Sequence, residues 1–68
     1  MARFLVYDDA RFLGESLTPE SARARHAASG RGRRHPWRPA RIVGGRVVEY
    51  AGGAGNRGRI VVSEDGGS

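Results

Sequence analysis

Residues 23–41 read RARHAASGRGRRHPWRPAR, and this stretch decides how the rest of the chain can be arranged. It holds seven of the twelve arginines, both histidines, the only tryptophan and two of the three prolines. No Asp or Glu occurs from Ser21 to Val48, so this positive charge has no local counter-charge. Trp37 is the only large apolar side chain between Leu17 and Ile42, so the stretch has little to bury.

The apolar residues outside this stretch form two clusters, one in residues 4–17 and one in residues 42–62. A chain of 68 residues allows one small domain, 1–68, and such a core supplies only about 3–5 kcal/mol of stability. The chain has no cysteine, so no disulfide can add to it. We therefore expect oligomerisation or docking on protein neighbours to order the chain.

The net charge of +5 is concentrated in residues 21–48, which carry eight arginines. No apolar run approaches the ~18 residues of a membrane span, so we expect no membrane contact. The apolar run Phe4–Tyr7 is too short for a signal peptide and is followed by two aspartates. The expected location is the cytoplasm, or a particle assembled there.

The local patterns predict an α+β fold with a small antiparallel sheet. Its three to four strands cover about 3–7, 41–43, 46–50 and 59–63, where β-branched and aromatic residues gather. A short helix is predicted over about 19–29, and a turn or short irregular helix over 10–17. Glycine, proline and repeated charge predict an extended basic arm at 30–41, a Gly-rich loop at 51–58 and a flexible tail at 64–68.

The helix has the clearest signals in the chain. Thr18 suits the N-cap, Pro19 suits the first helical position, and Gly30 is a plausible end. Helical spacing gives a smooth alanine side, formed by Ala24, Ala27 and Ala28. The opposite arc carries Arg23, Arg25, His26 and Ser29, which we expect to point outward.

Residues 41–50 predict a β-hairpin around Gly44-Gly45. A two-residue Gly-Gly turn is the simplest reading. A three-residue turn that includes Arg46 instead places Ile42 opposite Val48 and Arg41 opposite Glu49. The sequence leaves the register open between these two.

The basic stretch predicts contact with a polyanion. Its RGR and RGRR units resemble Arg-Gly segments that follow nucleic-acid backbones, and Trp37 could stack on a base. The candidate contact residues are Arg23, Arg25, Arg31, Arg33, Arg34, His35, Trp37, Arg38 and Arg41. DNA, RNA and an acidic protein surface remain open as partners.

A weaker candidate is a phosphate loop at Gly53, Gly55, Arg57, Gly58 and Arg59, because the three glycines spell GxGxxG. In dinucleotide-binding folds this motif follows a strand, opens a helix and precedes an acidic residue by about 20 positions. The chain ends ten residues after Gly58, so only a backbone nest for one phosphate remains possible.

Nothing in the sequence predicts an enzyme, a cofactor or a metal site. Asp8 and Asp9 are adjacent, so in a strand they would point to opposite faces. His26 and His35 lie nine residues apart and are expected on the basic surface.

The leading hypothesis is a non-catalytic, Arg-rich accessory subunit that docks in a larger assembly, such as a virion- or ribosome-type nucleoprotein. Its basic arm would contact nucleic acid or another polyanionic surface. The first alternative is a free-standing DNA- or RNA-binding regulatory protein. The second is a small protein inhibitor of an acidic partner. No small-molecule substrate is expected.

Overall fold

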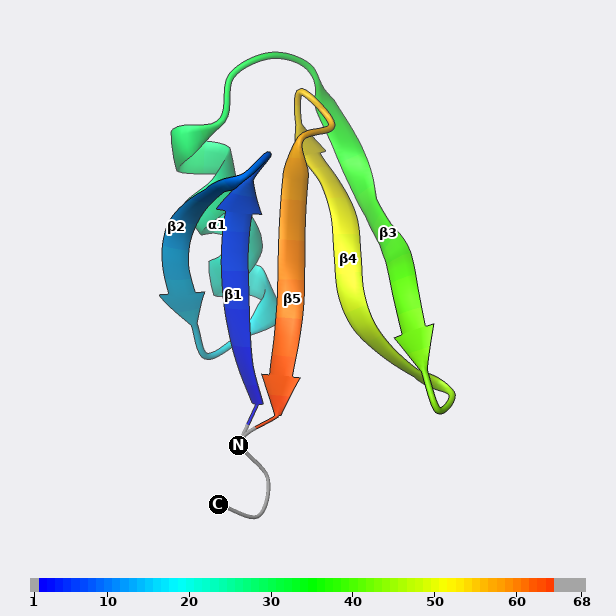
Figure 1. Cartoon of the computed structure of the whole chain (residues 1–68). Coiled ribbons are helices and arrows are strands. Elements are labelled where there is room, and N and C mark those ends of the chain that lie inside the picture. Colours follow the sequence, from blue (N-terminus) through cyan, green and yellow to red (C-terminus); the bar gives the residue numbers. More distant parts are fainter. Residues whose placement is uncertain (1, 65–68) are drawn as a thin grey trace.

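The computed structural model describes residues 2–64 as one five-stranded antiparallel sheet and one helix (Figure 1). The strand order is β2-β1-β5-β4-β3, so β2 and β3 form the two edges. Strand β1 pairs with β2 on one side and β5 on the other, and β4 pairs with β5 and β3. The elements are β1 (Ala2–Asp8), β2 (Arg11–Ser16), α1 (Pro19–Ser29), β3 (Arg34–Val43), β4 (Arg46–Ala54) and β5 (Gly58–Glu64).

The predicted sheet of three to four strands is wrong, because residues 11–16 form a further strand, β2. The sequence predicted a turn or an irregular helix there, since Gly14 interrupts the apolar pattern. Gly14 has a φ of 130° and lies where the pairing of β2 with β1 shifts register. Glycine within a strand often marks such a bulge, so it bends β2 without ending it.

The predicted extended arm is also wrong, because most of it forms the edge strand β3. Pro36 and Pro39 lie inside this strand, where neither can donate a backbone hydrogen bond. At a sheet edge that loss is tolerated, because the missing N–H can face away from the ladder. The pairing of β3 with β4 also has three register shifts, and two of them lie at the prolines, between His35 and Arg38 and between Pro39 and Arg41. Only residues 30–33 remain as a connection between α1 and β3.

The β3–β4 hairpin turns at Gly44-Gly45, and Val43 pairs with Arg46 across a two-residue turn. Both glycines have positive φ, 59° and 77°, as a type I′ turn requires. Arg41 still lies opposite Glu49, because one register shift inserts an extra residue in β4 between Val47 and Glu49. Each of the two readings of the sequence was therefore right about one part of the hairpin.

The predicted Gly-rich loop at 51–58 is shorter than expected. Residues 51–54 continue β4 and Gly58 begins β5, so only residues 55–57 form the turn. Asn56 takes a left-handed φ of 57° within it. Of the predicted tail, Glu64 ends β5 and residues 65–68 lie outside the described residues.

The helix begins and ends as the sequence predicted. The Thr18 hydroxyl accepts a hydrogen bond from the Ser21 amide at 3.1 Å, and the Gly30 amide donates to the His26 carbonyl at 2.7 Å. Arg23, Arg25 and Ser29 are exposed as predicted, but the alanine side and His26 are placed differently from the prediction. Ala22 and His26 are fully buried, whereas Ala24 and Ala28 are exposed. Within residues 2–64, no helix is long and apolar enough to cross a membrane.

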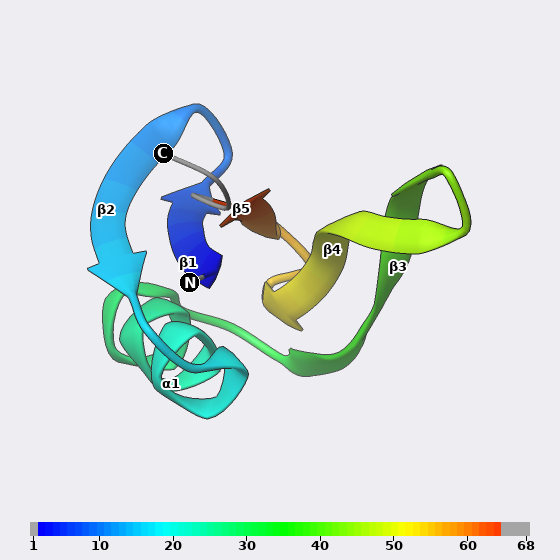
Figure 2. The same cartoon turned by 90° about the horizontal axis from the view of Figure 1, so that it is seen from below.

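The core lies between α1 and one face of the sheet, mainly under β1 and β2 (Figures 1 and 2). Val6, Ala22 and Ile60 form its fully enclosed centre. Phe4, Leu13, Trp37 and Tyr50 pack around that centre and are partly buried. Large apolar side chains also remain exposed, namely Phe12, Leu17, Ile42 and Val43.

Candidate nucleic-acid interface

A pocket of about 280 Å³ opens where α1 meets β3 and the end of β4. We call it the α1–β3 pocket. Its basic lining consists of Arg23 from the helix and Arg34 and His35 from β3. The remaining lining is largely apolar and comprises Ala24, Ala27, Trp37, Gly53 and Ala54, with the buried ring of His26. The fold therefore gathers four predicted contact residues, 23, 34, 35 and 37, around one opening.

The other predicted contact residues lie outside this pocket, in three different parts of the fold. Arg31 and Arg33 are exposed in the short connection that joins α1 to β3. Arg38 and Arg41 are exposed farther along β3, toward the hairpin turn. Arg25 is separate, because its Nε donates to the Ser16 hydroxyl at 3.4 Å on the β2 side of the helix.

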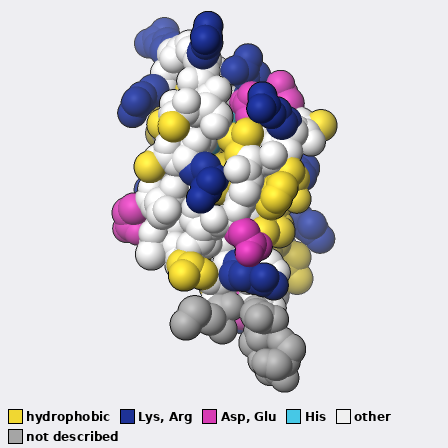
Figure 3. Space-filling model, turned by 90° about the vertical axis from the view of Figure 1, so that its left-hand side faces the viewer, with side chains coloured by type: hydrophobic (Ala, Val, Ile, Leu, Met, Phe, Trp, Pro, Cys, Tyr) yellow, Lys and Arg dark blue, Asp and Glu magenta, His cyan; other side chains and the backbone are white. Residues whose placement is uncertain are grey.

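None of the seven predicted contact arginines takes part in an ion pair between described residues. The ion pairs in residues 2–64 join Arg3 to Glu15, Arg46 to Glu64, Arg57 to Asp8 and His26 to Asp8. These pairs use Asp8, Glu15 and Glu64, and none of them includes a predicted contact arginine. In Figure 3 basic side chains gather at the end of the molecule opposite the termini, over the α1–β3 connection. This end of the fold therefore presents guanidinium groups without internal carboxylate partners.

Trp37 forms part of the pocket wall and is half-buried. A Cβ atom at Gly53 would lie 2.6 Å from Cζ2 of Trp37, and one at Gly58 would lie 2.9 Å from the same atom. The absence of side chains at these glycines therefore makes room for the indole ring. The His26 ring meets the indole edge-on, with 5.5 Å between centroids and an interplanar angle of 84°.

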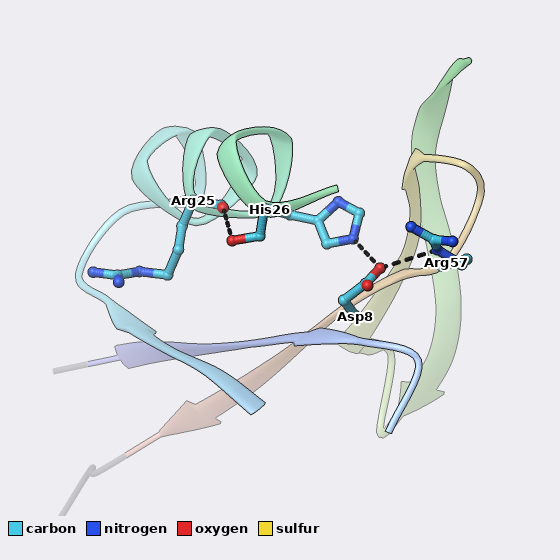
Figure 4. A network of polar contacts seen from close by, with 5 residues as sticks. Asp8, Arg25, His26 and Arg57 are labelled. Atoms are coloured by element: carbon cyan, nitrogen blue, oxygen red, sulfur yellow. Dashed lines mark hydrogen bonds and ion pairs between the residues drawn. The ribbon is translucent and has the colours of Figure 1, made fainter. Parts of the chain in front are cut away.

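The buried His26 contradicts the prediction that both histidines belong to the basic surface. Its Nε2 lies 3.0 Å from Oδ1 of Asp8, at the end of β1, and Arg57 Nε lies 3.3 Å from the same oxygen (Figure 4). Asp8 is 18 residues away in sequence, so no local pattern indicated this pair. The other ring nitrogen, Nδ1, is buried and has no hydrogen-bond partner among the described residues.

The hydrogen bond from His26 lowers the pKa of Asp8 below its usual 3.8, while partial desolvation acts in the opposite direction. The positive charge of Arg57 lowers this pKa further. An ionised Asp8 can only accept, so His26 carries a proton on Nε2. In the neutral ring Nδ1 is then an acceptor.

Because the pKa of Asp8 is lower in the folded state, its ionised form stabilises the fold. This contribution is complete above the usual pKa of 3.8 and is lost as pH falls through the lowered folded value. We predict that Asp8→Asn is less stable than the parent at neutral pH. Denaturant unfolding is measured over a pH series that spans the usual pKa of 3.8. The difference in unfolding free energy between the parent and Asp8→Asn should become smaller as the pH falls. A difference that does not change with pH would contradict this role for Asp8.

The weaker candidate, the phosphate loop, has its backbone amides occupied. Gly55 N donates to the Arg33 carbonyl at 2.7 Å, and Asn56 N donates to the Gly53 carbonyl at 3.2 Å. Arg57 binds Asp8, and Arg59 lies over the Tyr7 ring at 4.6 Å, on the other face of the sheet from Ile60. These glycines make space for Trp37 and form the turn, and the loop offers no open nest of amides.

Comparison of the chain with models of known protein families, with curated proteins and with solved structures found no match. Within residues 2–64, no three His, Cys, Asp or Glu side chains lie close enough together to hold a metal ion. The chemistry of the site is therefore that of guanidinium and imidazole groups beside a small apolar pocket, which suits a phosphate-bearing ligand.

Proposed function

We propose that this chain is a non-catalytic accessory subunit that binds the phosphate backbone of a nucleic acid through α1, β3 and their connection. The observation that carries the proposal is the set of seven arginines in 23–41 that form no ion pair with a described carboxylate. Unpaired guanidinium groups gain most from phosphate, whose oxygens they can contact in a bidentate manner. In this proposal the nucleic acid contacts the folded surface of α1, β3 and their connection, in place of the extended arm expected from sequence.

The same proposal places the chain in a larger nucleoprotein assembly of the virion or ribosome type, in the cytoplasm or in a particle assembled there. Two features support docking on protein neighbours. Among residues 2–64 the buried apolar side chains are limited to Val6, Ala22, Ala54 and Ile60. Ile42 and Val43 at the hairpin end are 60% and 53% exposed, so a protein neighbour that covers them would bury apolar surface.

Two alternatives use the same surface. A free-standing DNA- or RNA-binding regulator would bind nucleic acid without a protein neighbour, and the isolated chain would remain a stable monomer. An inhibitor would place the same arginines on an acidic protein. A pull-down from nuclease-treated lysate separates this second case, because protein capture would then persist without nucleic acid.

The test is a titration of the purified chain with labelled oligonucleotides at two salt concentrations. We expect the logarithm of the binding constant to fall linearly with the logarithm of salt, with a slope of about −0.9 per phosphate contacted on duplex and about −0.7 on single strands. No binding at low salt would remove nucleic acid from the proposal. A binding constant that does not change with salt concentration would exclude contact with the phosphate backbone of the nucleic acid.

A further inference from the structure

We propose that the α1–β3 pocket accepts one unpaired nucleobase, so that the chain prefers single-stranded nucleic acid to duplex. This inference rests on the proposed function, since it assigns a specific part of the nucleic acid to a specific part of that surface. Two kinds of lining meet in the pocket. Alanine methyl groups and Trp37 give an apolar wall, and Arg23 and Arg34 contribute charge from two different elements.

A nucleotide has a matching pair of features, because its flat heterocycle suits the apolar wall and its phosphates suit the arginines. With its heterocycle against the alanines and Trp37, its phosphates would lie near the guanidinium groups of Arg23 on the helix and Arg34 on β3. A base within a duplex is paired and stacked, so it cannot enter a pocket without being extruded. A pocket of this lining therefore favours single strands.

The size of the pocket agrees with one base. Its volume of about 280 Å³ lies just below the ~300–1,000 Å³ typical of sites for whole small molecules. It is also far larger than the ~30 Å³ that one water molecule occupies in the liquid. The space thus suits a single ring system and is too large for one bridging water to fill.

The unpartnered nitrogen of His26 supplies an independent pointer to a ligand. His26 lines the pocket and is fully buried, and its Nε2 is held by Asp8. Figure 4 shows the second ring nitrogen, Nδ1, on the side turned away from Asp8. Nδ1 is buried and has no hydrogen-bond partner among residues 2–64, and such groups are normally satisfied. The edges of every nucleobase carry both N–H donors and acceptor atoms, so a bound base offers a hydrogen-bond partner to this nitrogen in either of its protonation forms.

An acidic peptide that inserts an apolar side chain is the rival occupant, because it also combines carboxylates with an apolar group. Such a side chain would fill the volume but would leave His26 Nδ1 without a hydrogen-bond partner. The histidine therefore favours a heterocycle over a hydrocarbon. The peptide remains a possible result of the experiment below.

The experiment compares three labelled probes of equal length: single-stranded oligo-dA, the same strand with abasic sites, and the duplex. Insertion of one base is expected to make oligo-dA bind about 5- to 150-fold tighter than the abasic strand. Ala24→Leu, at an exposed position that lines the pocket, should remove that difference. Ala28→Leu is the matched control on the same helix outside the pocket, and it should leave the difference intact. Leucine is a good helix former, so neither change should unfold α1.

The ¹⁵N resonance of His26 Nδ1 gives a second readout in the parent chain. It should move when oligo-dA is added and stay in place with the abasic strand. If all three probes bind equally and with the same salt dependence, the pocket proposal fails while the proposed function stands. If no probe binds, the proposed function itself fails. If an acidic peptide displaces oligo-dA and Ala24→Leu blocks the peptide, the pocket belongs to a protein partner.

Discussion

Alanine at Gly58 is expected to destabilise the fold by about 1–3 kcal/mol, the usual cost of overpacking a filled site. The added Cβ would lie 2.7 Å from the Gly52 carbonyl oxygen and would overlap the indole ring of Trp37. The backbone at Gly58 is compatible with alanine, so the cost comes from the collision alone. In a domain whose core supplies only about 3–5 kcal/mol, this change removes a large share of the total stability.

A double-mutant cycle measures the collision directly. Urea unfolding is recorded for Gly58→Ala, Trp37→Leu and the double variant. Leucine lacks the ring atoms that the new Cβ would meet, so Gly58→Ala should cost clearly less in the Trp37→Leu background. An equal cost in both backgrounds would mean that the glycine is needed for another reason, and that the ring does not occupy the slot beside β5.

Replacing Arg23 and Arg34 together with glutamine is expected to weaken binding to a single-stranded oligonucleotide about a hundredfold at low salt. Each arginine should contribute about tenfold, as hydrogen bonds to charged groups contribute about 1.5 kcal/mol or more. The salt slope should also become shallower by about 0.7 for each phosphate that the variant no longer neutralises. Fluorescence anisotropy at several salt concentrations gives both quantities.

The matched control removes two other arginines and so gives the same net charge. Arg3 and Arg46 are paired with Glu15 and Glu64, away from the α1–β3 pocket. Their double glutamine variant should bind almost as the parent does. Equal losses of affinity in the two double variants would show that binding depends on the net charge of the protein and that no particular face of it carries the contact.

The sequence predicted the elements whose signals are local. The helix has its cap at Thr18 and its end at Gly30 within the same segment, and the hairpin turn needs only two adjacent glycines. The edge strand β2 was missed, and of the other edge strand, β3, only residues 41–43 were predicted. Gly14 in one and two prolines in the other oppose a strand locally, and only pairing with β1 and β4 makes these segments extended.

The candidate site was predicted in part for the same reason. Its arginines were evident as a run of charge without acids, and their lack of partners in the fold follows from that composition. The pocket itself was hidden, since apart from Trp37 its apolar lining is alanine and glycine, which give no distinctive signal in a sequence. His26 was assigned to the surface because its partner Asp8 is remote along the chain and helix geometry alone could not show which face is buried.

The most direct test of the α1–β3 face is a chemical-shift map of the ¹⁵N-labelled chain during titration with oligo-dA. We predict that the signals of Arg23, Arg34, His35 and the Trp37 indole move together and saturate at one concentration, because these groups surround one pocket. Signals of β1 and β2 should change little. Shifts that centre on β2 or the hairpin end, with the pocket residues unmoved, would contradict the proposed interface.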